Sequence, residues 1–322
     1  MKQKVVVFSQ IDQSILYQLQ QQFQVVQISP KLGDVQQQII EATRDADGMI
    51  GAGRILNATN LSQAKQLKVI SSVSVGYDNY DLAYLNQQQI WLAHTPHVLT
   101  ETTADLAFTL LMSAARKVAS LDAWTKQGLW QRTVSEAQFG VDIYGKTLGI
   151  IGLGHIGEAI ARRGFHGFNM NVLYHNRSEN PSRASALNAT YCDLNSLLKR
   201  SDFVVVAVDL NSDSQALIGE AELKLMQSHA VLVNIARGSV VDEQALIHAL
   251  KNRQIFAAGL DVYAKEPLQH SELFELDNVV TLPHVGSATA ATRKRMADLA
   301  YQNLLEALAG RQPTYVVNPL YQ

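Results

Sequence analysis

The stretch that decides the fold reads Leu148-Gly149-Ile150-Ile151-Gly152-Leu153-Gly154-His155-Ile156-Gly157. Its apolar first half indicates a buried strand, and the residues after it have a helical pattern. Gly152, Gly154 and Gly157 have the GxGxxG spacing, in which the first glycine permits a tight turn and the second lets the backbone approach a pyrophosphate. The third glycine lets helix and strand pack closely, and the helix N-terminus offers N–H donors to phosphate. The stretch therefore predicts a dinucleotide-binding unit.

Short runs rich in β-branched residues alternate with longer, helix-like stretches along the chain. The first series of predicted strands is Val5–Phe8, Val25–Ile28, Met49–Gly51, Val69–Ser72 and Ile90–Ala93. The second series is Thr147–Ile151, Asn171–Tyr174, Phe203–Val208, Val231–Ile235, Phe256–Leu260 and Val279–Leu282. This alternation is typical of parallel βα units, so we predict an α/β fold with two doubly wound parallel sheets.

Two long helices complete this prediction. Thr102–Asp105 resembles a capping box and opens an apolar helix that runs to Arg116-Lys117 and links the two domains. A second helix is predicted over Ala290–Leu308, and Thr314–Val317 after it could form an extended strand that returns to the first domain.

The composition excludes several classes of protein. The 322 residues are 47% hydrophobic and 17% charged, which is typical of a globular protein long enough for two domains. The formal net charge of −2 disfavours nucleic-acid binding, and the single cysteine, Cys192, fits a reducing compartment. The apolar stretch Val5–Phe8 is too short for a signal peptide or a membrane span, so we expect a cytoplasmic protein without membrane contact.

Three late strands are each followed by a residue suited to acid–base chemistry or anion binding. Arg237 follows the run that ends at Ile235, Glu266 stands in the loop after the next strand, and His284 follows Leu282. In open α/β sheets, ligands bind outside the carboxyl ends of the strands, so we expect the three side chains to meet at one site.

The three residue types match the needs of keto-acid reduction, in which hydride reaches carbon and a proton reaches oxygen. His284 suits the proton transfer, and Glu266 bonded to it would fix its tautomer and favour the protonated imidazole near neutral pH. Arg237 would hold the substrate, because its planar fork matches a carboxylate better than a lysine does. The pattern predicts a dehydrogenase that uses a nicotinamide dinucleotide and a 2-keto acid.

The choice of cofactor depends on the residues after the second strand of this unit. About 20 residues past the last glycine, an acidic residue normally binds the adenosine ribose. This sequence has Asn176-Arg177-Ser178 there, which suits a 2′-phosphate and favours NADP(H). Asp209 would repel that phosphate if it faced the pocket, although it could point to solvent or pair with Arg177. NAD(H) therefore remains an alternative.

The sequence also raises the question of a metal site. His94 and His97 are close in sequence, but Thr95-Pro96 between them breaks helical geometry and no third ligand stands nearby. We therefore expect no metal.

These residues resemble the D-isomer-specific 2-hydroxyacid dehydrogenases. The matching segments are Val75–Asp78, Thr100–Asp105, Gly152–Gly157, Asn234–Gly238, Gly259–Val262, Glu266-Pro267 and Pro283–Thr289. Within this family the chain looks most like the glyoxylate/hydroxypyruvate reductases, a branch that includes 2-ketogluconate reductases and typically prefers NADPH. The resemblance implies a flavodoxin-like substrate domain (1–98 plus 291–322), a Rossmann coenzyme domain (99–290) and an active site in a cleft between them.

The resemblance also implies roles for individual residues. Arg237, Glu266 and His284 would be catalytic, and the backbone of Val75 and Gly76 would bind the substrate carboxylate together with Arg237 and His284. Further cofactor contacts are implied for Thr103, His155, Ile156, Ile235, Asp261 and Gly286, with Asp261 near the carboxamide. Family members are usually homodimers joined through the coenzyme domain.

Two departures from the family pattern bear on the cofactor. His155 stands where many relatives have arginine, and Asp209 stands where they usually have proline or a small residue. Neither alters the three catalytic positions, and glyoxylate, hydroxypyruvate and 2-ketogluconate all remain open as substrates, as does the physiological direction.

Other members of the superfamily are alternatives. Formate dehydrogenases have glutamine where Glu266 stands, and many phosphoglycerate dehydrogenases carry a C-terminal regulatory domain, which we do not expect after the return to the first domain. A D-lactate type of dehydrogenase remains an alternative, as does a corepressor-like protein that senses dinucleotides without turnover.

Overall fold

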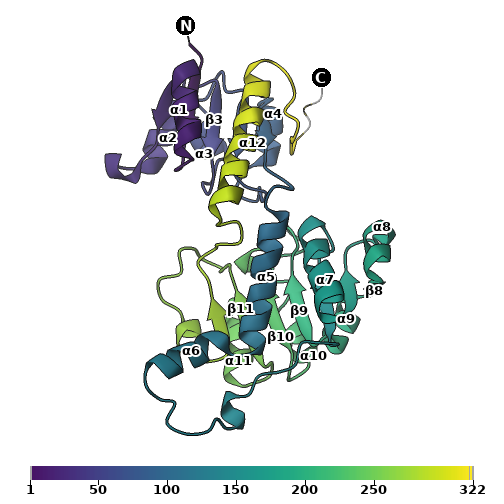
Figure 1. Ribbon diagram of the computed structural model, residues 1–322. Coiled ribbons are helices and arrows are strands. Elements are labelled where there is room, and N and C mark those ends of the chain that lie inside the picture. Colours follow the sequence, from purple (N-terminus) through teal and green to yellow (C-terminus); the bar gives the residue numbers. More distant parts are fainter. Residues whose placement is uncertain (1, 319, 321–322) are drawn as a thin grey trace. The chain divides into compact units, whose positions relative to one another are not determined.

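The computed structural model describes residues 2–318 and residue 320. Residues Thr100–Ser287 form one compact unit, and the described residues on either side of it form another (Figure 1). The boundaries lie after Leu99 and after Ser287, close to the predicted boundaries after residues 98 and 290.

The first unit contains a parallel sheet with five strands in the order β2-β1-β3-β4-β5. These strands are β1 (Lys4–Val7), β2 (Gln24–Gln27), β3 (Gly48–Gly51), β4 (Val69–Ser72) and β5 (Trp91–Ala93). All four pairings are parallel. The strand order is that of flavodoxin-like folds, so the predicted fold of this unit is confirmed.

Helices cover both faces of this sheet. They are α1 (Gln13–Gln22), α2 (Val35–Thr43), α3 (Ala58–Leu61), α4 (Leu82–Gln87) and α12 (Ala290–Leu308), with a 3₁₀ turn at Pro30–Leu32. One face buries Ile15 and Leu19 of α1 against α12, and Figure 1 shows these two helices side by side. The other face buries Ile39, Leu61 and Leu85 of α2, α3 and α4.

The C-terminal segment joins the first unit through α12. Met296, Ala300 and Leu304 recur at four-residue spacing and are buried, so the helix presents an apolar stripe to the sheet. The strand predicted over residues 314–317 is wrong. Only an isolated antiparallel bridge between Ala93 and Val316 forms there, with one backbone hydrogen bond on each side of it, from His94 to Tyr315 and from Val317 to Leu92.

The second unit contains a parallel sheet with seven strands in the order β12-β11-β10-β9-β6-β7-β8. The strands are β6 (Thr147–Ile151), β7 (Asn171–His175), β8 (Thr190–Tyr191), β9 (Phe203–Val206), β10 (Val231–Asn234), β11 (Ala257–Leu260) and β12 (Val279–Thr281). This is the Rossmann order with one more strand beyond β11, as predicted. Strand β8 was missed, because two residues at a sheet edge form no recognisable apolar run.

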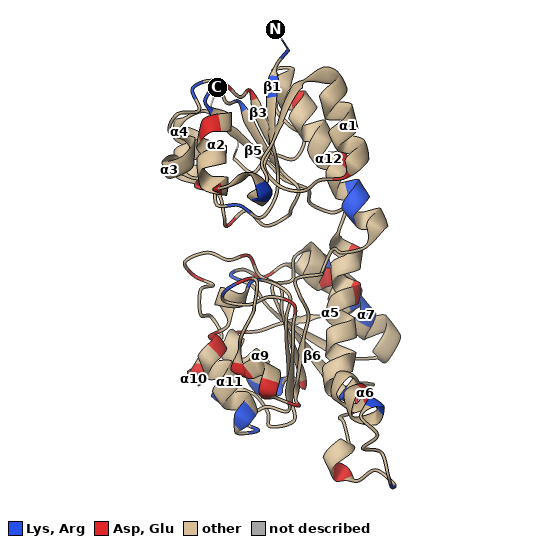
Figure 2. Cartoon of the chain, turned by 90° about the vertical axis from the view of Figure 1, so that its left-hand side faces the viewer, with Lys and Arg blue, Asp and Glu red and all other residues tan. Residues whose placement is uncertain are grey.

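Two layers of helices sandwich this sheet. The helices are α5 (Thr100–Ala115), α6 (Val118–Lys126), α7 (His155–Phe168), α8 (Pro181–Ala184), α9 (Leu194–Arg200), α10 (Glu220–Leu225) and α11 (Glu243–Lys251). Short 3₁₀ turns occupy Glu136–Gln138, Ser185–Leu187, Gly238–Val240 and Glu272–Glu275. Figure 2 shows α5 and α7 on one side of the sheet and α9, α10 and α11 on the other. None of the described helices combines the length and hydrophobicity needed to cross a membrane.

The start of α5 corrects one expectation. The helix begins at Thr100, so Thr102 lies within its first turn and is not its N-cap. The chain already turns at residues 97–99, where His97 has a φ of 70°, and the helix starts as soon as that turn ends.

Candidate active site

Arg237, Glu266 and His284 follow three neighbouring strands of the second sheet. Arg237 lies just after β10, Glu266 lies in the loop after β11, and His284 follows β12. Strand β11 pairs with β10 on one side and β12 on the other, both in parallel register. The carboxyl ends of these strands therefore share one edge of the sheet, where we expected the three side chains.

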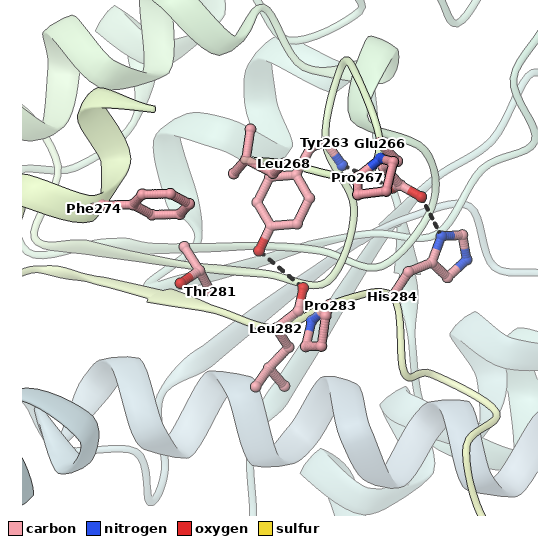
Figure 3. Close-up of a pocket in the computed structure, with 9 residues that line it drawn as sticks. All are labelled: Tyr263, Glu266, Pro267, Leu268, Phe274, Thr281, Leu282, Pro283 and His284. Carbon is pink, nitrogen blue, oxygen red and sulfur yellow. Dashed lines mark hydrogen bonds and ion pairs between the residues drawn. The ribbon is translucent and has the colours of Figure 1, made fainter. Parts of the chain in front are cut away.

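His284 and Glu266 are hydrogen-bonded, with 2.7 Å between His284 Nδ1 and Glu266 Oε2 (Figure 3). A carboxylate oxygen only accepts, so His284 Nδ1 carries the proton and Nε2 remains for chemistry on the far side of the ring. Burial raises the pKa of Glu266. The pKa is nevertheless lowered overall, by hydrogen bonds from His284 and the N–H of Tyr263 and by the charge of Arg237. Glu266 is therefore an anion well below neutral pH.

Tyr263 supports both members of this pair. Its N–H donates to Glu266 Oε1 at 3.0 Å, and its hydroxyl donates to the carbonyl of Leu282 at 2.9 Å, two residues before His284. Burial, reinforced by the charge of Asp261, raises the pKa of Tyr263 to about 12. The hydroxyl thus stays a donor at any physiological pH. Sequence reasoning missed Tyr263, because its role depends on where the β12 loop passes in space.

Gly238 lets the Arg237 loop approach the Glu266 loop. A Cβ atom on Gly238 would lie 1.8 Å from the carbonyl carbon of Tyr263, far inside contact distance. Only glycine therefore allows the two loops to pack at this separation.

Asp261 holds the loop after His284. It is 2% exposed, and its two carboxylate oxygens accept the N–H groups of Val285 at 2.7 Å and Gly286 at 2.8 Å. Burial raises the pKa of Asp261, and the two N–H donors oppose that shift. Thr103 of α5 lies beside Gly286, since a Cβ added to Gly286 would be 3.4 Å from Thr103 Cγ2. Three of the predicted cofactor residues therefore come together here.

A largely apolar pocket of about 420 Å³ opens beside His284 and Glu266. Figure 3 shows its lining, which is Tyr263, Glu266, Pro267, Leu268, Phe274, Thr281, Leu282, Pro283 and His284. No lysine or arginine belongs to this lining, so it suits an uncharged group better than a carboxylate.

A second pocket, of about 560 Å³, lies at the glycine-rich loop between β6 and α7. Gly152 has a φ of 101°, and a Cβ at Gly157 would lie 2.1 Å from the carbonyl oxygen of Gly152. A Cβ at Gly154 would meet no atom within 4 Å, so the backbone there is open to a ligand. This geometry fits a dinucleotide, whose pyrophosphate needs close backbone approach and the N-terminus of α7.

The residues after β7 line this second pocket. Asn176 Oδ1 accepts the N–H of Leu153 at 2.7 Å, so Asn176 holds the glycine-rich loop. Arg177 and Ser178 line the pocket directly, as does Asp209 after β9. Ile156 and Ile235 instead pack partly buried against the apolar core.

The charges in this pocket differ from those expected from the sequence. Arg177 pairs with Asp213 at 3.9 Å rather than with Asp209, and both partners are largely exposed. Such an exposed pair contributes little, so Arg177 can change partners. Arg183 also lines the pocket, forms an ion pair with Glu158, and lies 3.1 Å from His155 Nε2. Sequence reasoning missed Asp213 and Arg183, because both lie beyond the strand-end positions considered.

The structure also gives the place of the two predicted carboxylate-binding residues, and it bears on the question of a metal site. Val75 and Gly76 belong to the first unit, in the loop after β4. Among the described residues, no group of three or more His, Cys, Asp or Glu side chains could hold a metal ion.

The geometry of the second unit matches a known family of enzymes. The family model for the NAD binding domain of D-isomer specific 2-hydroxyacid dehydrogenases matches residues 108–286. This match covers more than half of the chain and most of the second unit. The protein therefore belongs to the D-isomer-specific 2-hydroxyacid dehydrogenases and is an oxidoreductase.

Full-length relatives narrow the family to one branch. The chain is 43% identical over 320 residues to glyoxylate/hydroxypyruvate reductase B of Klebsiella pneumoniae, covering 99% of each chain. It is also similar to the NADPH-dependent glyoxylate/hydroxypyruvate reductase from Sinorhizobium meliloti, solved in complex with NADP and malonate. That structure has a TM-score of 0.88 and 31% identity, with 100% of this chain and 99% of that chain covered. The TT0316 protein from Thermus thermophilus gives a TM-score of 0.86 at 37% identity, with 98% and 99% covered. The branch predicted from the sequence is confirmed.

Proposed function

We propose that this protein reduces small 2-keto acids, such as glyoxylate and hydroxypyruvate, to D-2-hydroxy acids with a reduced nicotinamide cofactor. The observation that carries the proposal is the 2.7 Å pair of His284 and Glu266, placed after adjacent strands in the same sheet as the glycine-rich pocket. Relatives over the whole chain that are named glyoxylate/hydroxypyruvate reductase support the substrate class.

In the proposed reaction, His284 Nε2 gives its proton to the carbonyl oxygen of the keto acid, while Nδ1 stays bonded to Glu266. The Glu266 carboxylate stabilises the imidazolium before that transfer. Arg237 binds the keto acid through its guanidinium, and the N–H groups of Val75 and Gly76 bind the carboxylate. The glycine-rich loop Gly152–Gly157 would hold the pyrophosphate of the nicotinamide cofactor, which would supply the hydride for the carbonyl carbon.

We propose NADP(H) as the preferred cofactor. The residues after β7 offer the Arg177 guanidinium and neutral groups from Asn176 and Ser178. Arg177 can leave its 3.9 Å pair with Asp213 for a 2′-phosphate, which accepts stronger, charge-assisted hydrogen bonds. The NADP complex of the Sinorhizobium meliloti relative supports the same choice.

Initial rates of cofactor oxidation test both proposals, with hydroxypyruvate or glyoxylate as substrate and NADPH or NADH as cofactor. We expect turnover that prefers NADPH and falls by about 10²–10⁴-fold in His284→Ala, the usual contribution of a positioned proton donor. Arg177→Ala should raise KM for NADPH and leave KM for NADH unchanged, because only NADPH carries the 2′-phosphate. Absence of turnover with every keto acid would contradict the reductase function, and equal use of NADH would contradict the cofactor preference.

We also propose a homodimer formed through the second unit. Large apolar side chains are exposed along the segment from α6 to β6, among them Leu129 (49%), Trp130 (63%), Phe139 (56%) and Tyr144 (70%). An exposed apolar cluster of this kind favours a protein interface. Sedimentation velocity should show a dimer that Trp130→Glu dissociates and Tyr17→Glu, at a 64% exposed residue of the first unit, does not. A monomeric wild-type protein would contradict the proposal.

A further inference from the structure

We propose that His94 is a positioning residue for substrate binding, because it fixes the loop that presents the N–H groups of Val75 and Gly76. This inference rests on the proposed function, in which those N–H groups bind the carboxylate of the keto acid. It assigns to His94 a role in substrate affinity that is separate from the chemistry at His284.

Three consecutive carbonyl groups of this loop are each held by a hydrogen bond. The carbonyl of Ser74 accepts the N–H of Thr95 at 2.9 Å. The carbonyl of Val75 lies 3.0 Å from His94 Nδ1, and the carbonyl of Gly76 accepts the hydroxyl of Ser74 at 2.7 Å. A carbonyl only accepts, so His94 Nδ1 is the donor and carries a proton whether the ring is neutral or charged.

Holding the carbonyls also fixes the amide N–H groups of the loop. In a trans peptide unit the C=O and the N–H of the next residue point in opposite directions. The three bonds therefore orient the N–H groups of Val75, Gly76 and Tyr77 away from the elements that hold the carbonyls. Within the described part of the chain, these three N–H groups donate to no protein group. Successive backbone N–H groups without a protein acceptor are the donors that anion-binding loops use.

His94 is itself fixed by the C-terminal segment of the chain. Its N–H donates to the carbonyl of Tyr315 at 3.0 Å, and its carbonyl accepts Asn303 Nδ2 at 2.9 Å. The Tyr77 ring meets the His94 ring edge-on, with centroids 6.1 Å apart. The imidazole therefore has little freedom to swing away from Val75.

A separate chain of hydroxyl groups supports Gly76. Tyr80 donates to Ser72 Oγ at 2.9 Å, and Ser72 Oγ lies 2.7 Å from Ser74 Oγ, which bonds to Gly76. Loss of His94 would thus free the Val75 carbonyl, and with it the N–H of Gly76, while this second support keeps the rest of the loop in place. The expected defect is specific to the anion site.

Three substitutions of His94 separate this role from a general role in folding. His94→Asn places an amide N–H near the position of Nδ1, His94→Gln places it near Nε2 instead, and His94→Leu removes it. We expect Leu and Gln to raise KM for hydroxypyruvate and Ki for oxalate by about tenfold, the effect of one lost hydrogen bond. The value of kcat and KM for NADPH should change little, and Asn should restore both carboxylate constants to near wild type.

Amide hydrogen exchange supplies a readout that does not depend on turnover. The N–H of Thr95, which donates to the Ser74 carbonyl of this loop, should exchange faster in His94→Leu and His94→Gln because the loop is held less firmly, and at the wild-type rate in His94→Asn. Unchanged KM, Ki and exchange in Leu and Gln would overturn the inference. Absent turnover in the wild type would instead overturn the proposed function, and the exchange rates would still decide whether His94 positions the loop. A uniform loss in all three variants, Asn included, would reduce His94 to a folding role.

Discussion

Asp261 accepts the N–H of Gly286 at 2.8 Å, which ties the end of β11 to the loop that carries His284. The other carboxylate oxygen of Asp261 accepts the adjacent N–H of Val285 at 2.7 Å. Both bonds are made by a side chain that is 2% exposed, so water cannot replace either partner. The position of His284 therefore depends on a residue that binds the two N–H groups directly after it.

Replacement of Asp261 by Asn should displace this loop. An amide offers one acceptor, so its NH₂ group would face the N–H of Val285 or Gly286, at a cost of about 1–3 kcal/mol. We expect lower stability to denaturant and a kcat reduced by about tenfold or more, because His284 moves from its position. Asp277→Asn, which breaks an exposed pair with Arg253, serves as the control and should change neither quantity. Wild-type kcat in Asp261→Asn would contradict this role.

The charge of Glu266 should contribute stability over a defined range of pH. Its pKa in the folded protein is lowered below the ordinary value of about 4.5, so the folded state favours the carboxylate. The contribution is fully present above about 4.5 and is lost as pH falls through the lower, folded pKa. Glu266→Gln should have a lower unfolding free energy than the wild type near neutral pH. Below pH 4.5, the unfolding free energy of Glu266→Gln should fall less steeply than that of the wild type. Urea unfolding across this range measures both effects, and parallel curves for the two proteins would contradict the prediction.

The sequence predicted the parts of this architecture that depend on local pattern. Strands β4 and β6 have the predicted bounds, because a run of four or five residues that contains β-branched side chains suits a buried strand and is short for a helix. Arg237, Glu266 and His284 were found because each follows a predicted strand. The order of residues along the chain shows this without any knowledge of distances in space. The prediction of Phe203–Val208 was too long, since β9 ends at Val206. Residues after it line the second pocket, and hydrophobicity alone does not show where strand pairing stops.

What the sequence could not predict depends on contacts between distant segments. Tyr263 acquires its role from the carbonyl of Leu282, which is 19 residues away. Asp213 pairs with Arg177 because the loop after β9 folds back toward the end of β7, and loop paths carry no periodic signal. The sequence rejected His94 as a metal ligand but could not identify its partner, which is the carbonyl of Val75.

The Tyr263 hydroxyl should contribute stability that is lost at alkaline pH. Burial raises its pKa from 10.0 to about 12, so the folded state favours the protonated phenol. That contribution is fully present below about 10 and is lost as pH rises through about 12. Tyr263→Phe removes the bond to Leu282, so it should lower stability near neutral pH and show a shallower decline over this alkaline window. Chemical unfolding of both proteins measures the difference, and a decline of wild-type steepness in Tyr263→Phe would refute the assignment.

Gly238→Ala should separate the loops that carry Arg237 and Glu266. The new Cβ would lie 1.8 Å from the carbonyl carbon of Tyr263, and backbone on both sides must move to relieve the overlap. We expect a loss of about 1–3 kcal/mol or more in unfolding free energy and a lower kcat/KM for the keto acid. Gly167→Ala is the matched control, because a Cβ on that glycine of α7 would meet no atom within 4 Å. That control should be neutral or slightly stabilising, since alanine favours a helix over glycine by about 1 kcal/mol. Equal activity of the two variants would show that close approach at Gly238 is not what aligns Arg237 with Glu266.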